Sequence, residues 1–195
     1  GGSTYGRGDW WWGPKSIPRD RAQQLGKLSK RQREIEQEKE GIRQGLLFPH
    51  TGEPAVYHCP GDKRINSASP TLTYVSYSGA GGMNGEQQGL SVKKNTEIRN
   101  PSGKYIYVEE SDPRQYNMGS WIISMGPGNN WIDPVASWHN DYSTLSWADG
   151  HATTKKWLSS KTKEGARGTV GTSSRPGTFN FGMYDKDNRD IMYMK

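Results

Sequence analysis

Alternation of apolar and polar side chains identifies one part of this chain as a β-hairpin. Leu145 and Trp147 are two residues apart, which predicts a short strand with both side chains on one face. The run 151–157 (HATTKKW) is suited to the return strand. Between the two runs, Asp149-Gly150 predicts a type I′ turn, because that turn needs a positive φ at both central residues.

Other apolar runs predict further short strands. In 104–109 (KYIYVE), the strongest of them, alternation places Ile106 and Val108 on one face and Tyr105 and Tyr107 on the other. The remaining candidate strands are 55–59, 72–77, 121–124 and 191–194. The glycine-rich or polar segments expected to form loops are 79–89, 126–130 and 159–177. Short strands with connections of hairpin length favour an antiparallel sheet.

The polar run 19–45 predicts one long helix. It contains no proline and is rich in Gln, Lys, Arg and Glu, which favour helices. Asp20 is a candidate N-cap and Gly45 a candidate stop. Its apolar residues at a spacing of seven are Leu28, Ile35 and Ile42. So thin a stripe predicts a helix that touches the sheet along one edge, with its N-terminal half projecting.

Together these elements predict an α+β fold in which one long N-terminal helix packs on a small antiparallel β-sheet with long loops. Residues 1–18, which are rich in Trp and Gly, are expected to form an extended lead. Residues 19–195 are expected to form a single globular domain, with the helix at about 19–45 and the sheet and loops over 53–195.

Composition limits the core and the partners. Hydrophobic residues make up 31% of the 195 positions, so the core is modest, and eight Trp and ten Tyr against three Phe supply much of its area. The net charge is +6, but 26 basic residues are interspersed with 20 acidic ones and no basic block is interleaved with aromatics. A nucleic-acid partner is therefore not expected.

Membrane and cysteine signals are equally sparse. No apolar run reaches the roughly 20 residues that a membrane helix needs, and no signal peptide is visible. The single Cys59 cannot form an internal disulfide, and one cysteine excludes a zinc cluster built from cysteines.

Three residues around the hairpin form a candidate metal site. His139, Asp149 and His151 offer the imidazole and carboxylate ligands that zinc or a similar ion takes, with Asp141 close in sequence. The alternative is structural, with Asp149 supplying the turn geometry and His139 hydrogen-bonding the backbone near the hairpin. No His-Glu-x-x-His pattern is present, so a metal-dependent hydrolase at these residues is the less favoured function.

A second candidate is an acidic group of oxygen ligands suited to calcium. Its members are Glu109, Glu110, Ser111, Asp112 and Asp133. Their spacing matches no EF-hand loop, and a solvated strand end is the favoured alternative. A divalent cation, calcium or zinc, is thus considered at these two places and firmly expected at neither.

Enzymatic signals are weak. The chain has no Gly-x-Ser-x-Gly elbow, and on a strand His58 would point away from its neighbour Cys59. No enzyme is expected. The adjacent Trp10, Trp11 and Trp12 either pack on the helix or sheet, or form a platform for sugar rings. Together with Trp121, Trp131 and Trp138, they leave a secreted carbohydrate- or surface-binding module as the alternative function.

Four blocks of the sequence resemble a known family. These are 45–52 (GLLFPHTG), 56–62 (VYHCPGD), His139 followed after nine residues by Asp149-Gly150, and 190–194 (DIMYM). They resemble the signatures of a large bacterial family of prepilin-like proteins, within the pseudopilins and type IV pilins of type II secretion-like systems. The resemblance covers roughly 41 to the end. Such proteins begin with a cleavage site and a long apolar helix, which this sequence lacks, and removal of that helix is expected.

The resemblance implies a pilin-like fold and a structural role in a pseudopilus or type IV pilus-like fibre. His139, Asp149 and Gly150 would then fix a hairpin and perform no chemistry. The implied partners are other pilin-like subunits and secretion-system components, with membrane contact only through the N-terminal helix that is absent here. The implied location is the periplasmic face of the inner membrane or the cell surface of a Gram-negative-type bacterium.

Overall fold

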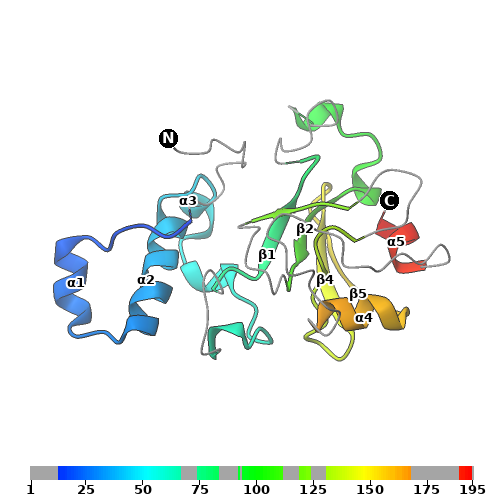
Figure 1. The fold of residues 1–195 in the computed structure, drawn as a ribbon. Helices are drawn as coiled ribbons and strands as arrows, with labels where there is room; N and C mark the ends of the chain where they lie inside the picture. The colour runs from blue at the N-terminus through cyan, green and yellow to red at the C-terminus, as the bar shows by residue number, and fades with distance from the viewer. Residues whose placement is uncertain are drawn as a thin grey trace.

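The computed structural model describes residues 13–66, 74–83, 92, 94–111, 119–123, 131–167 and 189–194. These residues form an α+β fold in which short helices lie on both sides of a five-stranded sheet (Figure 1). Trp10, Trp11, Trp12 and Asp112 lie outside the described residues. Within the described ranges, no helix is long and apolar enough to span a bilayer.

The sheet is mixed, with strand order β3-β1-β2-β4-β5. The strands are β1 Tyr77–Ala80, β2 Tyr105–Glu109, β3 Ser120–Trp121, β4 Tyr142–Trp147 and β5 Ala152–Lys156. Three of the pairings are antiparallel, but β1 and β3 are parallel, so the prediction of a purely antiparallel sheet is wrong at this edge. β3 lies on the side of β1 opposite β2 and runs parallel to β1, and so antiparallel to β2.

The predicted hairpin is confirmed, with a different turn. β4 and β5 pair from Tyr142 with Lys156 to Ser146 with Ala152. The Trp147 N–H donates to the His151 carbonyl at 2.9 Å, and the Gly150 N–H donates to the Trp147 carbonyl at 3.0 Å. Only Gly150 in this turn has a positive φ, of 94°. The connection is therefore a three-residue loop that ends in a left-handed glycine, and the predicted type I′ turn is wrong.

The single long helix predicted over 19–45 is not present. The two helices found there are α1 Arg19–Leu25 and α2 Lys30–Arg43. Gly26 ends the first in the left-handed region, with φ 65°. Ser29 starts the second with a capping box, in which its side chain accepts the Gln32 N–H and the Gln32 side chain accepts the Ser29 N–H. Asp20 lies in the first turn of α1, and Pro18 occupies the cap position.

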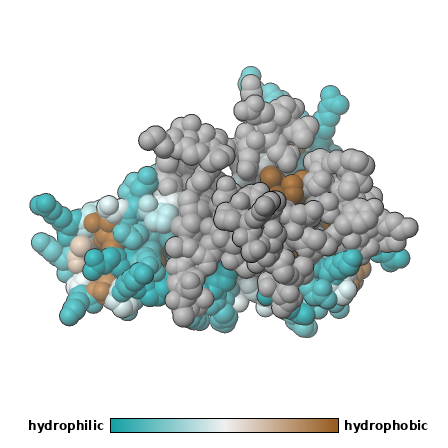
Figure 2. Space-filling view, in the orientation of Figure 1, coloured by the Kyte–Doolittle hydropathy of each residue, from teal (hydrophilic) through white to brown (hydrophobic). Residues whose placement is uncertain are grey.

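The N-terminal part of the predicted helix region is the less buried part. α1 has no buried residue, and α2 buries only positions near its C-terminal end. In Figure 1 both helices lie on the outer side of the fold, and the surface above them is largely hydrophilic with a few apolar side chains between (Figure 2). Surface ion pairs such as Glu36 with Lys39, at 2.8 Å, suit such a solvated helix.

Three further elements differ from prediction. The run 55–59 was expected to be a strand but starts with a 3-10 turn, η1 Pro54–Tyr57, because the proline fixes φ and the Glu53 side chain accepts the Ala55 N–H. The run 191–194 lies in a helix, α5 Arg189–Met194, and part of the polar segment 159–177 forms another, α4 Ser160–Ala166. The remaining short elements are α3 Phe48–Thr51, η2 Arg64–Asn66, η3 Asn95–Glu97 and η4 Pro101–Gly103.

Each face of the sheet has its own apolar core. The main core consists of Val108, Trp121, Ile123, Trp131, Val135, Leu145, Trp147, Trp157, Ile191 and Met194. The second core joins Ile42, Tyr57 and Tyr74 with half-buried neighbours on α2, α3 and β2. A register irregularity between Tyr105 and Tyr107 puts Tyr105 in the main core and Tyr107 in the second. Their predicted placement on a common face is therefore wrong.

Trp157 is a central residue of the main core. It is completely buried, and its ring packs edge-on against Trp131 with ring centroids 6.0 Å apart. Its indole N–H lies within hydrogen-bonding distance of the Ala136 carbonyl, at 2.8 Å, and of Ser143 Oγ, at 2.7 Å. The adjacent Leu158 side chain is 56% exposed.

These neighbours form a matched pair for testing the core. Trp157→Ala removes a buried ring and leaves polar partners unsatisfied, so we expect a loss of about 3–5 kcal/mol in the free energy of unfolding. Leu158→Ala should change it by no more than about 0.5 kcal/mol. Urea unfolding followed by far-UV circular dichroism measures both, and similar losses in the two variants would contradict this core.

Candidate functional site

Three metal-ligand or nucleophile side chains converge at one edge of the second core. Cys59 follows η1, Glu109 ends β2, and His139 lies in the turn before β4. His139 Nε2 is 3.2 Å from Cys59 Sγ and 3.1 Å from Glu109 Oε1. One donor atom from each residue lies within 4.8 Å of the other two. We call this group the Cys59–Glu109–His139 cluster.

Glu109 is the innermost member of the cluster. Side chains two residues apart on a strand lie on the same face, so Glu109 lies on the same face of β2 as Tyr107. Its side chain is fully buried there. One carboxylate oxygen faces His139, and the other accepts the backbone N–H of Thr144 on β4 at 2.8 Å. Strand pairing therefore fixes the orientation of this carboxylate.

The loop that carries Cys59 is held by its own polar contacts. Ser76 Oγ accepts the Cys59 N–H at 3.0 Å and donates to Asp62 at 2.7 Å. Asp62 is also paired with the Arg64 guanidinium, at 2.7 Å. That guanidinium lies over the Trp138 ring, 5.1 Å from its centroid. The loop thus positions Cys59 beside the residue that follows Trp138.

His139 forms the solvent side of the cluster. Its side chain is 41% exposed, whereas Cys59 is 2% exposed. The next two residues, Asn140 and Asp141, both have positive φ, which turns the chain sharply into β4. Asp141 itself pairs with Arg167 and Lys163, at 2.6 and 3.5 Å, and so points toward the C-terminal end of α4.

The surroundings keep the thiol protonated. Burial raises the pKa of Cys59 to about 11, with a further rise from Glu109, while the N–H groups of Gly61 and Asp62 act in the opposite direction. Burial also raises the pKa of Tyr77 to about 12, helped by the charges of Glu109 and Cys59. A thiol with this pKa is a weak nucleophile at neutral pH.

The geometry differs from that of a catalytic triad. In such a triad one imidazole nitrogen contacts the nucleophile and the acid holds the other. Here Cys59 and Glu109 both contact Nε2 of His139, so one nitrogen serves both neighbours. The arrangement suits hydrogen bonding or the coordination of a cation better than nucleophilic attack.

The structure does not bring the predicted set of His139, Asp149 and His151 together. The Asp149 carboxylate accepts the His151 N–H at 3.1 Å and also contacts Nδ1 of that histidine, and hydrogen bonds from His151 lower the pKa of Asp149. The His151 ring stacks on Trp147, with centroids 5.5 Å apart. His139 lies before β4 and the other two after it, so a strand of roughly 20 Å separates them.

The acidic group considered for calcium is also placed differently from expectation. A solvated strand end was favoured, but Glu109, Glu110 and Asp133 are all buried. Ser78 donates a hydrogen bond to Glu110, and Asp133 accepts the Ile122 N–H at 2.8 Å. Ser111 Oγ lies within hydrogen-bonding distance of the carbonyls of Val135 and Ala166, at 2.9 and 2.8 Å. These side chains serve the packing of adjacent segments.

The tryptophans considered for sugar binding are mostly internal. Trp121 and Trp131 are each 1% exposed, so neither ring is available as a platform. Trp138 is half-buried and its ring is occupied by Arg64. The described tryptophans of that set therefore give the carbohydrate-binding alternative no support.

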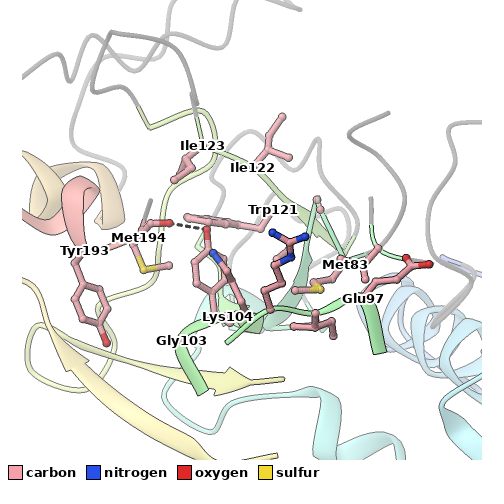
Figure 3. Close-up of a pocket in the computed structure, with 16 residues that line it drawn as sticks. Met83, Glu97, Gly103, Lys104, Trp121, Ile122, Ile123, Tyr193 and Met194 are labelled. Atoms are coloured by element: carbon pink, nitrogen blue, oxygen red, sulfur yellow. Dashed lines mark hydrogen bonds between the residues drawn. The ribbon is translucent and has the colours of Figure 1, made fainter. Parts of the chain in front are cut away.

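Hollows lined by described residues lie beside the sheet. One, of about 450 Å³, lies beside Tyr105, Trp121 and Met194, and the Tyr105 hydroxyl donates across its wall to the Met194 carbonyl at 2.8 Å (Figure 3). The other is an apolar groove of about 330 Å³ that includes Tyr77 and Tyr107. Tyr77 thus lines this groove, and the charges of Glu109 and Cys59 help to raise the pKa of its hydroxyl. Neither hollow by itself indicates a reaction.

No model of a protein family, no curated protein and no solved structure matches the chain.

Sequence reasoning found two of the three clustered residues as ligand candidates, His139 and Glu109, but assigned them to two different sites and did not join Cys59 to either. As a nucleophile, Cys59 was paired with its neighbour His58, whose ring instead contacts the Tyr74 carbonyl at 2.8 Å. Glu109 was grouped with acidic residues next to it in sequence. A usable signal was present, because Cys59 and His139 belong to two of the blocks that carry the prepilin-like resemblance.

The thiol of Cys59 should react slowly in the folded protein. At pH 8, a thiol with a pKa of about 11 is ionised in roughly one molecule in a thousand, against roughly one in four for an ordinary cysteine. We expect iodoacetamide to modify the folded chain at least about 100-fold more slowly than the urea-unfolded chain. Mass spectrometry with a chelator in the buffer measures both rates, and equal rates would contradict this environment.

Proposed function

We propose that this chain is a structural subunit of a pseudopilus or type IV pilus-like assembly of a bacterial secretion system. The observation that carries the proposal is that each of the four resembling blocks stabilises the fold. Such use of signature residues is expected of a subunit whose task is to present a fixed shape to its neighbours.

The first two blocks stabilise the helical side of the sheet. Block 45–52 supplies Leu47 and Phe48, which pack against the second core. Block 56–62 supplies Tyr57 to the same core and Asp62 to the ion pair that shapes its loop. Both blocks therefore attach α2 and α3 to the sheet.

The other two blocks stabilise the hairpin and the chain after it. His139 joins the start of β4 to β2, and Asp149-Gly150 forms the turn at the opposite end. Asp190 accepts the backbone N–H groups of Leu158 and Ser159, at 2.9 and 2.8 Å, and so holds the chain beyond β5. These contacts support a structural role for the signature residues.

In this proposal the globular part covers the outside of a fibre, and an apolar helix preceding it packs in the fibre core. The partners are other pilin-like subunits and secretion-system components. The site of action is the periplasmic face of the inner membrane or the cell surface.

The gene that encodes this chain provides the first test. We expect its codons upstream of Gly1 to specify a Phe-Thr-Leu-Ile-Glu-type start followed by about 20 apolar residues, the length that spans a bilayer. Antibodies against the chain should then label sheared surface fibres in immunogold electron microscopy. A gene without an apolar segment, or labelling of freely secreted protein alone, would contradict the proposal.

A further inference from the structure

The Cys59–Glu109–His139 cluster contains three donor types that a single metal ion accepts together. A thiol, a carboxylate and an imidazole come from segments 30 to 80 residues apart in sequence. Zinc binds all three groups, whereas calcium and magnesium prefer oxygen ligands alone. The cluster is distinct from the set predicted around the hairpin, with which it shares only His139.

Charge compensation distinguishes Glu109 from the buried carboxylate beside it. Asp62 is paired with a guanidinium through several hydrogen bonds. Within the described part of the chain, the basic side chain that pairs with Glu109 is His139, which carries charge only when protonated. Burying a carboxylate is costly unless it is paired or coordinates a metal. A cation at this cluster would supply the compensation that Asp62 already has.

The surrounding backbone prepares the cluster for an ion. The Asp62 N–H donates to the Cys59 carbonyl at 2.9 Å and the Cys59 N–H donates to Ser76 Oγ at 3.0 Å, so the backbone that carries the sulfur is fixed on both sides. The Thr144 N–H holds the carboxylate oxygen of Glu109 that faces away from His139. Outer contacts of this kind orient metal ligands.

Gly61 brings the loop close to the cluster. A Cβ at this position would lie 3.1 Å from Trp138 Cβ, 3.2 Å from His139 Cε1 and 3.4 Å from Cys59 Sγ. The absence of a side chain therefore lets the sulfur and the imidazole approach each other.

We propose that the Sγ of Cys59, a carboxylate oxygen of Glu109 and the Nε2 of His139 bind one divalent transition-metal ion of the zinc class. Tetrahedral zinc places such ligand atoms about 3.4–3.6 Å apart, given metal–ligand bonds of about 2.0–2.3 Å. The two separations from Nε2, 3.2 and 3.1 Å, lie within a few tenths of an ångström of these values, and the Sγ and a carboxylate oxygen lie within 4.8 Å of each other. Solvent at the exposed side of His139 supplies water as the fourth ligand. This inference goes beyond the proposed fibre role.

Metal loading of the purified chain tests the proposal directly. The protein is stripped with EDTA, reloaded with zinc, freed of excess metal by gel filtration and analysed by inductively coupled plasma mass spectrometry. We expect one zinc ion per chain. Cobalt in place of zinc should give a thiolate-to-metal charge-transfer band, because the sulfur of Cys59 is a ligand.

Variants assign the ligands. Cys59→Ser and His139→Ala should each weaken zinc binding on the order of 100-fold or more in competition with a chromophoric chelator, since each removes one of three protein ligands. Cys59→Ser should also abolish the charge-transfer band. His151→Ala is the matched control, because it removes the histidine of the hairpin turn and should leave zinc affinity unchanged. Glu109 is fully buried, so Glu109→Gln is interpreted only if its far-UV circular dichroism spectrum is native. The main test is therefore His139→Ala, because His139 is exposed.

Two outcomes would overturn the proposal. One is zinc content well below one ion per chain in the folded wild-type protein. The other is unchanged affinity in folded Cys59→Ser and His139→Ala, or a loss of affinity in His151→Ala alone, which would move the ion to the hairpin turn. All these readouts come from the isolated chain, so they do not depend on whether fibres form.

Discussion

The buried carboxylate of Glu109 joins three parts of this fold: the sheet, the loop that carries Cys59 and the turn into β4. It ends β2, accepts a backbone N–H from β4, contacts His139 before β4 and lies beside the loop that follows η1. A buried charge stabilises a fold only when its partners are correctly placed, and removing one partner is costly. Those partners come from segments distant in sequence, so satisfying this carboxylate fixes the relative positions of the sheet, the Cys59 loop and the turn into β4.

Two cores on opposite faces of the sheet explain how a chain with so few apolar residues covers its strands. On one face the ring of Trp131 contacts those of Trp121 and Trp157 edge to face, at centroid separations of 5.9 and 6.0 Å. Large rings bury much area per residue, so few positions suffice. On the other face the core is smaller, and polar contacts around Asp62 and Glu109 complete the packing. The apolar positions are therefore concentrated on one side, and the polar network lies on the other.

Local signals in the sequence were sufficient for some elements. The hairpin of β4 and β5 and the central strand β2 were predicted because alternation and a turn dipeptide act over a few residues. The break between α1 and α2 had a local signal as well, in Gly26 followed by Ser29 and Gln32 as a capping box, but the continuous polar composition was given more weight. Pro54 likewise indicated a turn where an apolar run suggested a strand.

The rest depended on contacts that no local pattern contains. The run 191–194 is apolar enough for a strand, yet it forms a helix whose Ile191 and Met194 reach the tryptophan core. The parallel pairing of β3 with β1 joins residues about 40 positions apart, which no local pattern specifies. The cluster joins residues separated by up to 80 positions, each of which had been interpreted with its neighbours in sequence. When the ligands of a site are distant in sequence, the site can be found from the structure, or from two sequence motifs considered together.

This chain has one cysteine, so no internal disulfide holds its long connections in place. Closing a loop costs conformational entropy that grows slowly with its length, so a cross-link gains most when it joins distant segments. The cluster joins the loop at Cys59, the end of β2 and the start of β4, which are 30 to 80 residues apart. An ion held there would perform the mechanical task of a disulfide. The proposed metal site and the proposed structural role are thus compatible, because the three side chains that would hold an ion also join the Cys59 loop, the end of β2 and the turn into β4.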